Sequence, residues 1–360
     1  MFGNVMAIER ALGTGIIISS SVPIAQRVEQ RIRAFVEEYE SVLSRFRADS
    51  LVSRMASAEH GGDFEFPSWA QPLFAIYSEF YAATHGAFDA CVGADLLALG
   101  YDNSVQFIPE SAANASENSG SASASWNKYH LALPTMWADI SRADGSTTLH
   151  TNQPVQLDFG AAGKGYFVDL VAKIIKDELG GDSLSNSDSP ADCDSRADFD
   201  FLVNAGGDMR ACSGEENSQI KVALENPFDT TQAVGVASIA SGSLCASSAA
   251  RRRWKVKDAS YLGKDASGFE SNLIATHLIN ALDGTPAQKL SASWAYVSSK
   301  TCAFPTAYAD ALATALFISQ ESDLQKIVQT TSAEFAVISP NCAACQVRKT
   351  SAFPAHFFAE

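Results

Sequence analysis

Apolar residues recur along this chain with two spacings, and each spacing predicts a different kind of element. From residue 24 to residue 43, large apolar side chains return every three or four positions, which predicts a long amphipathic helix. A β-rich run over residues 13–19 precedes it and predicts a strand. The same helical period over residues 69–84 predicts a second helix that ends at His85-Gly86, where glycine can supply a C-terminal cap.

Shorter apolar runs predict strands, most of them in the second half of the chain. A helix is expected over residues 167–175 from the spacing of its apolar side chains, and the almost wholly apolar residues 308–316 are also expected to be helical. Long helices mixed with many short strands, without a regular alternation of the two, predict an α+β fold. We expect residues 1–360 to form a single domain. The expected strands cover residues 155–159, 201–204, 220–224, 234–240 and 291–298.

Two segments interrupt this order because they contain almost no large apolar residues. Residues 111–125 consist mainly of Ser, Ala, Asn and Gly, and residues 182–200 are dominated by Asp and Ser. Such compositions bury too little apolar surface to offset the entropy lost on ordering. Both segments are therefore expected to be surface insertions that carry none of the chemistry.

The chain is acidic, with a formal net charge of −15 and a sequence pI near 4.8. A nucleic acid or an anionic membrane would be repelled over most of such a surface, and an anionic substrate would need a locally positive pocket. The first ten residues have no basic stretch followed by an apolar core, so no signal peptide or membrane segment is expected and the predicted location is cytoplasmic. Seven scattered cysteines predict reduced thiols, and Cys342 and Cys345 lack the second pair that would indicate a metal site.

The helix expected over residues 308–316 carries the first candidate for chemistry. Asp310 and Thr314 are four residues apart, so both side chains lie on one face about one turn from each other. Carboxylate and hydroxyl oxygens are ligands for a hard cation such as Mg²⁺, which usually completes its shell with water and substrate phosphate. The alternative is a capped or back-bonded polar pair in a core helix, and the segment alone favours that alternative.

A glycine-rich turn joins the strand expected over residues 155–159 to the helix that follows. Residues 160–165 read Gly-Ala-Ala-Gly-Lys-Gly and do not form a P-loop, because that pattern needs Ser or Thr after the lysine, here Lys164. Glycines at a strand-to-helix turn still allow backbone groups to approach an anionic ligand at the helix N-terminus. A phosphate-binding turn and an ordinary tight turn with a solvated lysine are both consistent with these residues.

Two weaker candidates follow further along the chain. The segment Gly206-Gly207-Asp208 after the strand over residues 201–204 is typical of an ordinary turn. His277 stands beside an apolar, strand-like stretch and could accept a proton, although a single histidine there is more often structural. The other five histidines form no pattern of metal ligands or of a nucleophile triad.

Taken in order, seven segments of the chain resemble one family. The resemblance spans roughly residues 10–320, and an ordered set of blocks is far more specific than any single motif. The blocks are residues 11–14, 44–50, 84–89, 158–169 with a Gly-Lys-Gly-Tyr core, 203–208, 276–280 and 309–314. Together they resemble the ApbE-like FAD:protein FMN transferases, which implies an α+β fold of mixed, T-fold-like sheets with flanking helices.

The resemblance implies a Mg²⁺-dependent cleavage of the FAD diphosphate, in which FMN passes to a threonine or serine hydroxyl of an acceptor flavoprotein and AMP leaves. It implies that Mg²⁺ is held by Asp310, Thr314 and the backbone carbonyl of Gly163, and that His277 takes the proton of the acceptor hydroxyl. Aromatic rings at positions 46 and 166 would offer apolar faces to the flavin or adenine rings. The residues implied for binding the flavin nucleotide are Leu12, Phe46, Ala87, Phe88, Asp89, Gly160, Lys164, Tyr166 and Ile279.

The chain departs from the family pattern at three places. Residues 278–284 read Leu-Ile-Asn-Ala-Leu-Asp-Gly instead of Ile-Ile-Asp-Pro-x-Thr-Gly, and residues 247–249 read Ser-Ser-Ala instead of Thr-Ser-Gly. The asparagine that commonly follows Ser-Arg-Leu is missing after Met55. Two alternatives to the transferase therefore stay open: a Mg²⁺-dependent FAD pyrophosphatase that releases FMN and AMP, and an FAD-binding protein without catalysis.

Overall fold

The computed structural model of the chain describes residues 2–108, 135–179, 199–214, 219–256, 274–340 and 346–358. The expected insertion at residues 111–125, most of that at residues 182–200, and Cys342 and Cys345 lie outside the described residues. Among the helices of the described ranges, none is long and apolar enough to cross a membrane.

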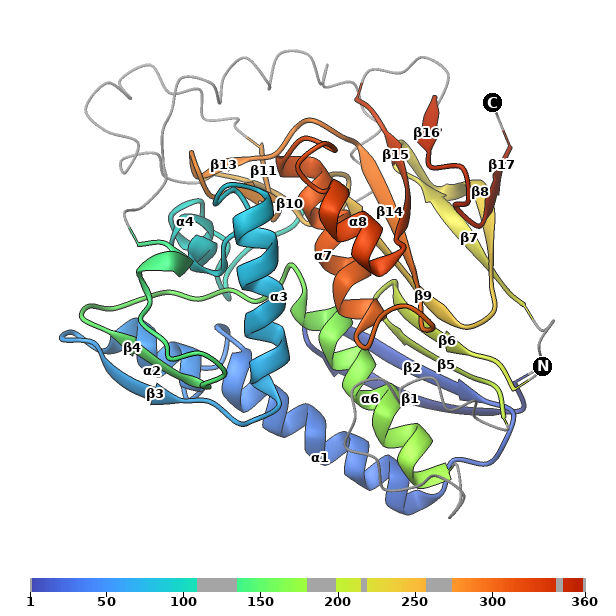
Figure 1. The fold of residues 1–360 in the computed structure, drawn as a ribbon, viewed down its shortest axis with the longest axis horizontal. Helices are drawn as coiled ribbons and strands as arrows, with labels where there is room; N and C mark the ends of the chain where they lie inside the picture. Colours follow the sequence, from blue (N-terminus) through green and yellow to red (C-terminus); the bar gives the residue numbers. More distant parts are fainter. Residues whose placement is uncertain are drawn as a thin grey trace.

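An eight-stranded antiparallel sheet forms the centre of the fold (Figure 1). Its neighbours follow the order β1-β2-β5-β6-β9-β14-β15-β16, so the N-terminal hairpin forms one edge and the C-terminal strands form the other. The strands are β1 (Asn4–Ala11), β2 (Thr14–Ser20), β5 (Phe201–Ala205), β6 (Asp208–Cys212), β9 (Gly242–Ser248), β14 (Ala292–Ser298), β15 (Glu334–Ile338) and β16 (Val347–Lys349).

Helices cover one face of this sheet (Figure 1). The sheet contacts α6 and α7, which also pack against each other, while α1 packs on α6 and α3 packs on α7. Because α7 is surrounded in this way, it is apolar nearly all round, as expected for a buried helix. The helices are α1 (Gln26–Leu43), α2 (Leu51–Ser57), α3 (Ala70–Ala83), α4 (Gly93–Ala98), α6 (Gly163–Leu179), α7 (Pro305–Ile318) and α8 (Gln325–Thr331), with short 3-10 helices η1 (Ala90–Val92) and η3 (Trp137–Asp139).

A second, three-stranded sheet packs on the opposite face of the large sheet (Figure 1). Alternate residues of β14 serve the two cores: Ala295 and Val297 belong to the helix-side core, whereas Trp294 belongs to the core under the small sheet. The small sheet consists of β7 (Ile220–Asn226), β8 (Asp229–Ile239) and β17 (Ala355–Phe357). Three further pairs are β3 (Gly62–Glu65) with β4 (Thr148–Thr151), β10 (Arg253–Lys255) with β11 (Ile274–Thr276), and β12 (Ile279–Asn280) with β13 (Thr285–Pro286).

The expected helix end near residue 85 is present. Helix α3 ends at Ala83, and His85 and Gly86 then take left-handed conformations with φ of 54° and 92°. The amide of Gly86 donates to the carbonyl of Tyr81 at 2.8 Å, which satisfies one of the open carbonyls of the last helical turn. The chain is thereby turned toward residues 87–89.

The strand expected over residues 155–159 is not formed. Val155, Leu157 and Phe159 are buried in alternation, but the amide of Asp158 donates to the carbonyl of Ala90 at 2.7 Å instead of to a neighbouring strand. Alternating burial reports an extended backbone with one covered face, and it does not require strand pairing. This prediction was wrong because the segment packs between α2 and η1, whose positions no local pattern specifies.

Candidate active site

A cleft of about 1440 Å³ opens on the side of the large sheet where several chain turns meet. Its walls come from the β1–β2 turn, the β5–β6 turn, the start of α6, the middle of α7, the end of β9 and the loop that leads into β10. These segments are far apart in sequence. The cleft is therefore a product of the tertiary fold.

Helix α7 places two of the predicted residues in the wall of this cleft. Asp310 and Thr314 are 3% and 8% exposed and lie on the face of α7 that lines the cleft. One oxygen of Asp310 accepts a hydrogen bond from the amide of Gly165 at 3.0 Å. Thr314 Oγ1 lies 3.3 Å from Ser247 Oγ on β9. The helix periodicity has thus brought a carboxylate and a hydroxyl to one site.

The start of α6 reaches α7 because it is glycine-rich. A Cβ on Gly165 would lie 2.8 Å from the Cβ of Asp310 and would also clash with the backbone of Thr306. A larger residue would therefore push the two helices apart. Next to it, the carbonyl of Gly163 accepts a hydrogen bond from the Tyr39 hydroxyl at 2.7 Å and lines the same cleft.

The oxygens of Asp310, Thr314 and Gly163 form a ligand set suited to a hard cation. Among the described residues, no group of three His, Cys, Asp or Glu side chains could hold a metal by itself. A cation here would therefore depend on mixed ligands, namely one carboxylate, one hydroxyl and one carbonyl, together with water or substrate oxygens. The chemistry of these donors fits Mg²⁺ and does not fit zinc.

Three charged side chains, those of Lys164, Asp208 and Asp310, lie close together beside these oxygens. The ammonium group of Lys164 pairs with the buried carboxylate of Asp208 and lies 3.7 Å from Asp310. Burial and, after it, the negative charge of Asp208 raise the pKa of Asp310 to about 7, although Lys164 and the amide of Gly165 oppose the rise. Burial alone would lower the pKa of Lys164, but the charges of Asp208 and Asp310 outweigh it and raise that pKa above its ordinary value. The lysine stays protonated and partly neutralises two buried acids.

A second buried carboxylate, Asp169 of α6, fixes the N-terminal end of α7. It accepts hydrogen bonds from the amides of Thr306 and Ala307 at 3.0 and 2.9 Å and from the Thr306 hydroxyl at 2.6 Å, and it pairs with Arg210 at 2.7 Å. Since α7 has no capping side chain of its own, Asp169 supplies the cap from the neighbouring helix. This contact sets how α6 and α7 meet beside the cleft.

His277 lines the cleft between β11 and β12. Within the described part of the chain, its Nδ1 atom is buried and has no hydrogen-bond partner. Burial, together with the positive charges of Arg252 and Lys164, lowers its pKa to about 3. The imidazole is therefore neutral at physiological pH and able to accept a proton.

The fold brings all but one of the other predicted residues into the wall of the cleft. The amide of Leu12, whose φ of 53° is left-handed, donates to Glu40 at 2.8 Å and is thereby fixed at the tip of the β1–β2 hairpin. The carboxylate of Asp89 accepts from the amides of Cys91 and Trp137, so its first role is to shape the loop. The lining residues are Leu12, Phe46, Ala87, Phe88, Asp89, Gly160, Lys164 and Ile279.

Tyr166 does not lie in the cleft wall. Its side chain is fully buried, and its hydroxyl donates to the carbonyl of Trp69. On α6, Tyr166 faces the helix-side core, where its ring packs 5.2 Å from that of Phe304. The expected stacking on a flavin or adenine ring is therefore not available to this side chain, because the cleft is lined by α6 residues two and three positions earlier.

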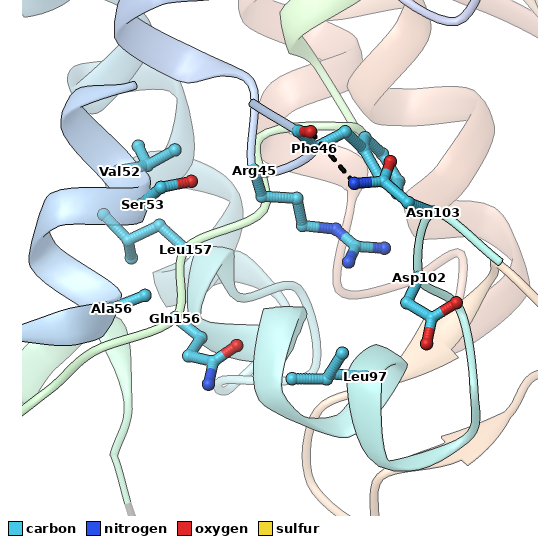
Figure 2. Close-up of a pocket in the computed structure, with 10 residues that line it drawn as sticks. All are labelled: Arg45, Phe46, Val52, Ser53, Ala56, Leu97, Asp102, Asn103, Gln156 and Leu157. Atoms are coloured by element: carbon cyan, nitrogen blue, oxygen red, sulfur yellow. Dashed lines mark hydrogen bonds between the residues drawn. The ribbon is translucent and has the colours of Figure 1, made fainter. Parts of the chain in front are cut away.

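Phe46 and Arg45 separate the cleft from a smaller pocket of about 200 Å³ next to α2 (Figure 2). The Arg45 guanidinium points into this pocket, lies 4.2 Å from the Phe46 ring centroid and pairs with Asp158 at 2.6 Å. Asn103 donates to the Phe46 carbonyl at 3.1 Å. The Phe46 ring is 40% exposed, so it offers a supported apolar face on the cleft side.

Three residues of the site were not expected from the sequence. Asp208 read as an ordinary turn residue, Tyr39 as part of an apolar helix face, and Ser247 only as a departure from a family pattern. Each contacts a site residue distant in sequence. Asp208 pairs with Lys164, the Tyr39 hydroxyl donates to the carbonyl of Gly163, and the Ser247 hydroxyl lies next to that of Thr314. For Tyr39, the available sequence signal was a polar group on an otherwise apolar helix face. For Asp208 and Ser247, the sequence carried no signal.

One protein family matches most of the chain. The model of the ApbE family matches residues 12–184 and 194–338. None of the curated proteins compared with the chain matches it in sequence.

Solved structures of similar fold cover nearly the whole chain. The ApbE protein from Thermotoga maritima is 17% identical over 97% of this chain and 98% of its own, with a TM-score of 0.68. The flavin transferase ApbE from Vibrio cholerae is 15% identical over 97% of each chain, with a TM-score of 0.64. The apo flavinyl transferase ApbE from Pseudomonas stutzeri is 18% identical over 97% of this chain and 95% of its own, with a TM-score of 0.63.

At these identities the structural likeness supports the α+β fold, while the family model covers most of the sequence. The chain belongs to the ApbE family.

Proposed function

We propose that this protein is a Mg²⁺-dependent FAD:protein FMN transferase, which attaches FMN through a phosphoester bond to a threonine or serine of an acceptor flavoprotein. The observation that carries the proposal is the convergence of Asp310, Thr314, the Gly163 carbonyl and a neutral His277 in one cleft of about 1440 Å³. The class of reaction is supported by the similar proteins from Vibrio cholerae and Pseudomonas stutzeri, which are named flavin and flavinyl transferases.

The reaction needs alignment and charge stabilisation more than covalent chemistry from the protein. The acceptor hydroxyl oxygen attacks the phosphorus on the FMN side, the bond from this phosphorus to the bridging oxygen breaks, and AMP leaves with that oxygen. We assign to His277 the role of taking the hydroxyl proton, because the residue lines the cleft and its imidazole is neutral. The balanced products are the FMN-bearing acceptor, AMP and one proton.

Asp310, Thr314 and the carbonyl of Gly163 are the residues that would hold Mg²⁺. When bound, the ion would neutralise charge on the diphosphate and keep the reacting oxygens in line. Lys164 holds its positive charge beside the same carboxylate, and its pairing with Asp208 keeps the ammonium group at the base of the cleft. The exposed face of Phe46 and the side chain of Leu12 would pack against the flavin or adenine ring.

Incubating the purified protein with FAD and Mg²⁺, with and without an acceptor flavoprotein, tests the proposal. A transferase yields an acceptor that stays fluorescent on a denaturing gel and gains one FMN moiety by mass spectrometry, with AMP released in equal amount. Free FMN and AMP without an acceptor would instead identify a pyrophosphatase. FAD that stays bound and unchanged under both conditions would identify a carrier and overturn the proposal.

A further inference from the structure

Arg252 lies in the loop between β9 and β10 and lines the same cleft. Its backbone is left-handed, with a φ of 51°, which is uncommon for a residue with a side chain and adds conformational cost. Leu12, on the β1–β2 turn, is also left-handed and lines the same cleft. The cost of this backbone conformation suggests that the position of the Arg252 side chain in the cleft serves a function.

The side chain of Arg252 spans the space between two walls of the cleft. Its Nη1 donates to the Tyr101 hydroxyl at 3.3 Å, and a Cβ placed on Gly13 of the β1–β2 turn would lie 3.9 Å from its Nη2. The Tyr101 ring stacks on Trp254 with centroids 4.9 Å apart, and Phe46 packs edge-on against it at 5.6 Å. Tyr101 is therefore a fixed support that holds the guanidinium over the cleft.

In the part of the chain that the structure describes, the other cations that line the cleft, apart from Arg10, each pair with a carboxylate. Arg45 pairs with Asp158, Lys164 with Asp208 and Asp310, and Arg251 with Glu225. Arg47 likewise pairs with Glu37 and Asp49. In the described ranges, the cleft-lining cations without a carboxylate partner are Arg252 and Arg10, and Arg10 is exposed to solvent that screens its charge.

The charge of Arg252 acts on the part of the cleft where the phosphoryl chemistry is proposed. After burial, it is the next contribution that lowers the pKa of His277. In a chain with a net charge of −15, an anionic diphosphate needs such a local positive charge to enter. A half-buried guanidinium that has no carboxylate partner among the described residues offers paired donors that match the oxygens of a phosphate.

Building on the proposed function, we propose that Arg252 is a phosphate-binding residue, whose guanidinium donates to a non-bridging oxygen of the FAD diphosphate while the ligands on α7 hold its metal. The residue then selects flavin nucleotides over riboflavin, which has no phosphate. Its side-chain position is set by Tyr101 and by the left-handed backbone of the loop.

Fluorescence titration of FAD and of riboflavin against wild type, Arg252→Gln and Arg252→Lys in the presence of Mg²⁺ tests the inference. Loss of a charged hydrogen bond should weaken FAD binding by Arg252→Gln at least about tenfold. Riboflavin binding should stay within about twofold of wild type, and Arg252→Lys should recover part of the FAD affinity. Arg10→Gln removes the same charge from the exposed rim of the cleft and should change FAD binding less than about twofold.

Two results would overturn the inference while leaving the proposed function intact: FAD affinity of Arg252→Gln equal to that of wild type, or an equal loss of FAD and riboflavin, which would mark a role in cleft shape. Failure of wild type itself to bind FAD would overturn the proposed function and the inference together. Equal melting temperatures of the variants would show that these differences arise in the cleft.

Discussion

Two buried carboxylates lie at helix α7, and they differ in the number of hydrogen-bond donors and cations around them. At its N-terminal end, Asp169 is saturated by two amides, a hydroxyl and the guanidinium of Arg210. In its middle, Asp310 receives one amide hydrogen bond and a lysine at 3.7 Å. Because a buried charge without enough donors costs several kcal/mol, a fold keeps one only where something else compensates.

The difference separates a structural acid from the carboxylate that we propose as a metal ligand. Burial raises the pKa of both groups, but of the two only Asp310, whose pKa is raised to about 7, lines the cleft. A perturbed carboxyl in a cleft is a candidate functional group, whereas a saturated one is a packing element. We therefore expect that removing the Asp169 carboxylate lowers stability, whereas removing the Asp310 carboxylate lowers activity.

Asp310→Asn should give the largest effect in this comparison. We expect transfer activity to fall about a thousandfold, equivalent to about 4 kcal/mol of transition-state stabilisation, because the principal charged ligand of the metal is lost. The melting temperature should stay equal or rise, since an unfavourable buried charge is removed. Steady-state transfer assays and thermal unfolding check both parts, and a folded variant with wild-type turnover at limiting Mg²⁺ would contradict the ligand assignment.

Asp169→Asn should act mainly on stability. Its loss leaves the guanidinium of Arg210 buried without its anion, a situation that costs about 3–5 kcal/mol. Urea unfolding of the wild type, Asp169→Asn and Asp310→Asn should place the Asp169 variant far below the other two. If Asp310→Asn were instead the less stable variant, the assignment of the two roles would have to be reversed.

The dependence of Mg²⁺ affinity on pH should follow the pKa of Asp310. A proton and the metal compete for the same carboxylate, whose pKa is raised to about 7, chiefly by burial. Affinity should therefore fall about tenfold for each pH unit below 7 and level off above about 8. Calorimetric titration of Mg²⁺ at several pH values measures this slope, and a flat profile between pH 5 and 8 would argue against Asp310 as a ligand.

Thr314→Val should give the smallest effect of the series. The substitution keeps the shape of the side chain and removes one neutral ligand, while Ser247 Oγ at 3.3 Å stays near the site. We expect the Mg²⁺ concentration for half-maximal activity to rise about tenfold, with stability little changed. Thr314→Ser, which retains the hydroxyl, is the matched control and should behave as wild type does.

Local patterns predicted helix α7 and the long helices, because those elements depend on spacing within one segment. The period of four that joins Asp310 to Thr314 is present in α7, and the glycine after α3 ends that helix as expected. Ordered blocks along the chain also indicated the family, which no single motif could do. These features can be predicted without knowledge of tertiary contacts, because they are encoded within short stretches of sequence.

Long-range features could not be obtained in the same way. Residues 155–159 alternate like a strand but pack without a strand partner, and Tyr166 was expected in the cleft but faces the core. The pairing of Lys164 with Asp208 joins residues 44 positions apart. Such contacts depend on how helices and sheets dock, and residue type alone does not determine them.

Diffraction from crystals soaked with FAD and Mn²⁺, an anomalous scatterer with the ligand preferences of Mg²⁺, tests the central claim most directly. We predict an anomalous peak within ligand distance of the Asp310 carboxylate, Thr314 Oγ1 and the Gly163 carbonyl, with the FAD diphosphate on its open side. A peak elsewhere in the cleft, or bound FAD with no metal at these three oxygens, would contradict the account.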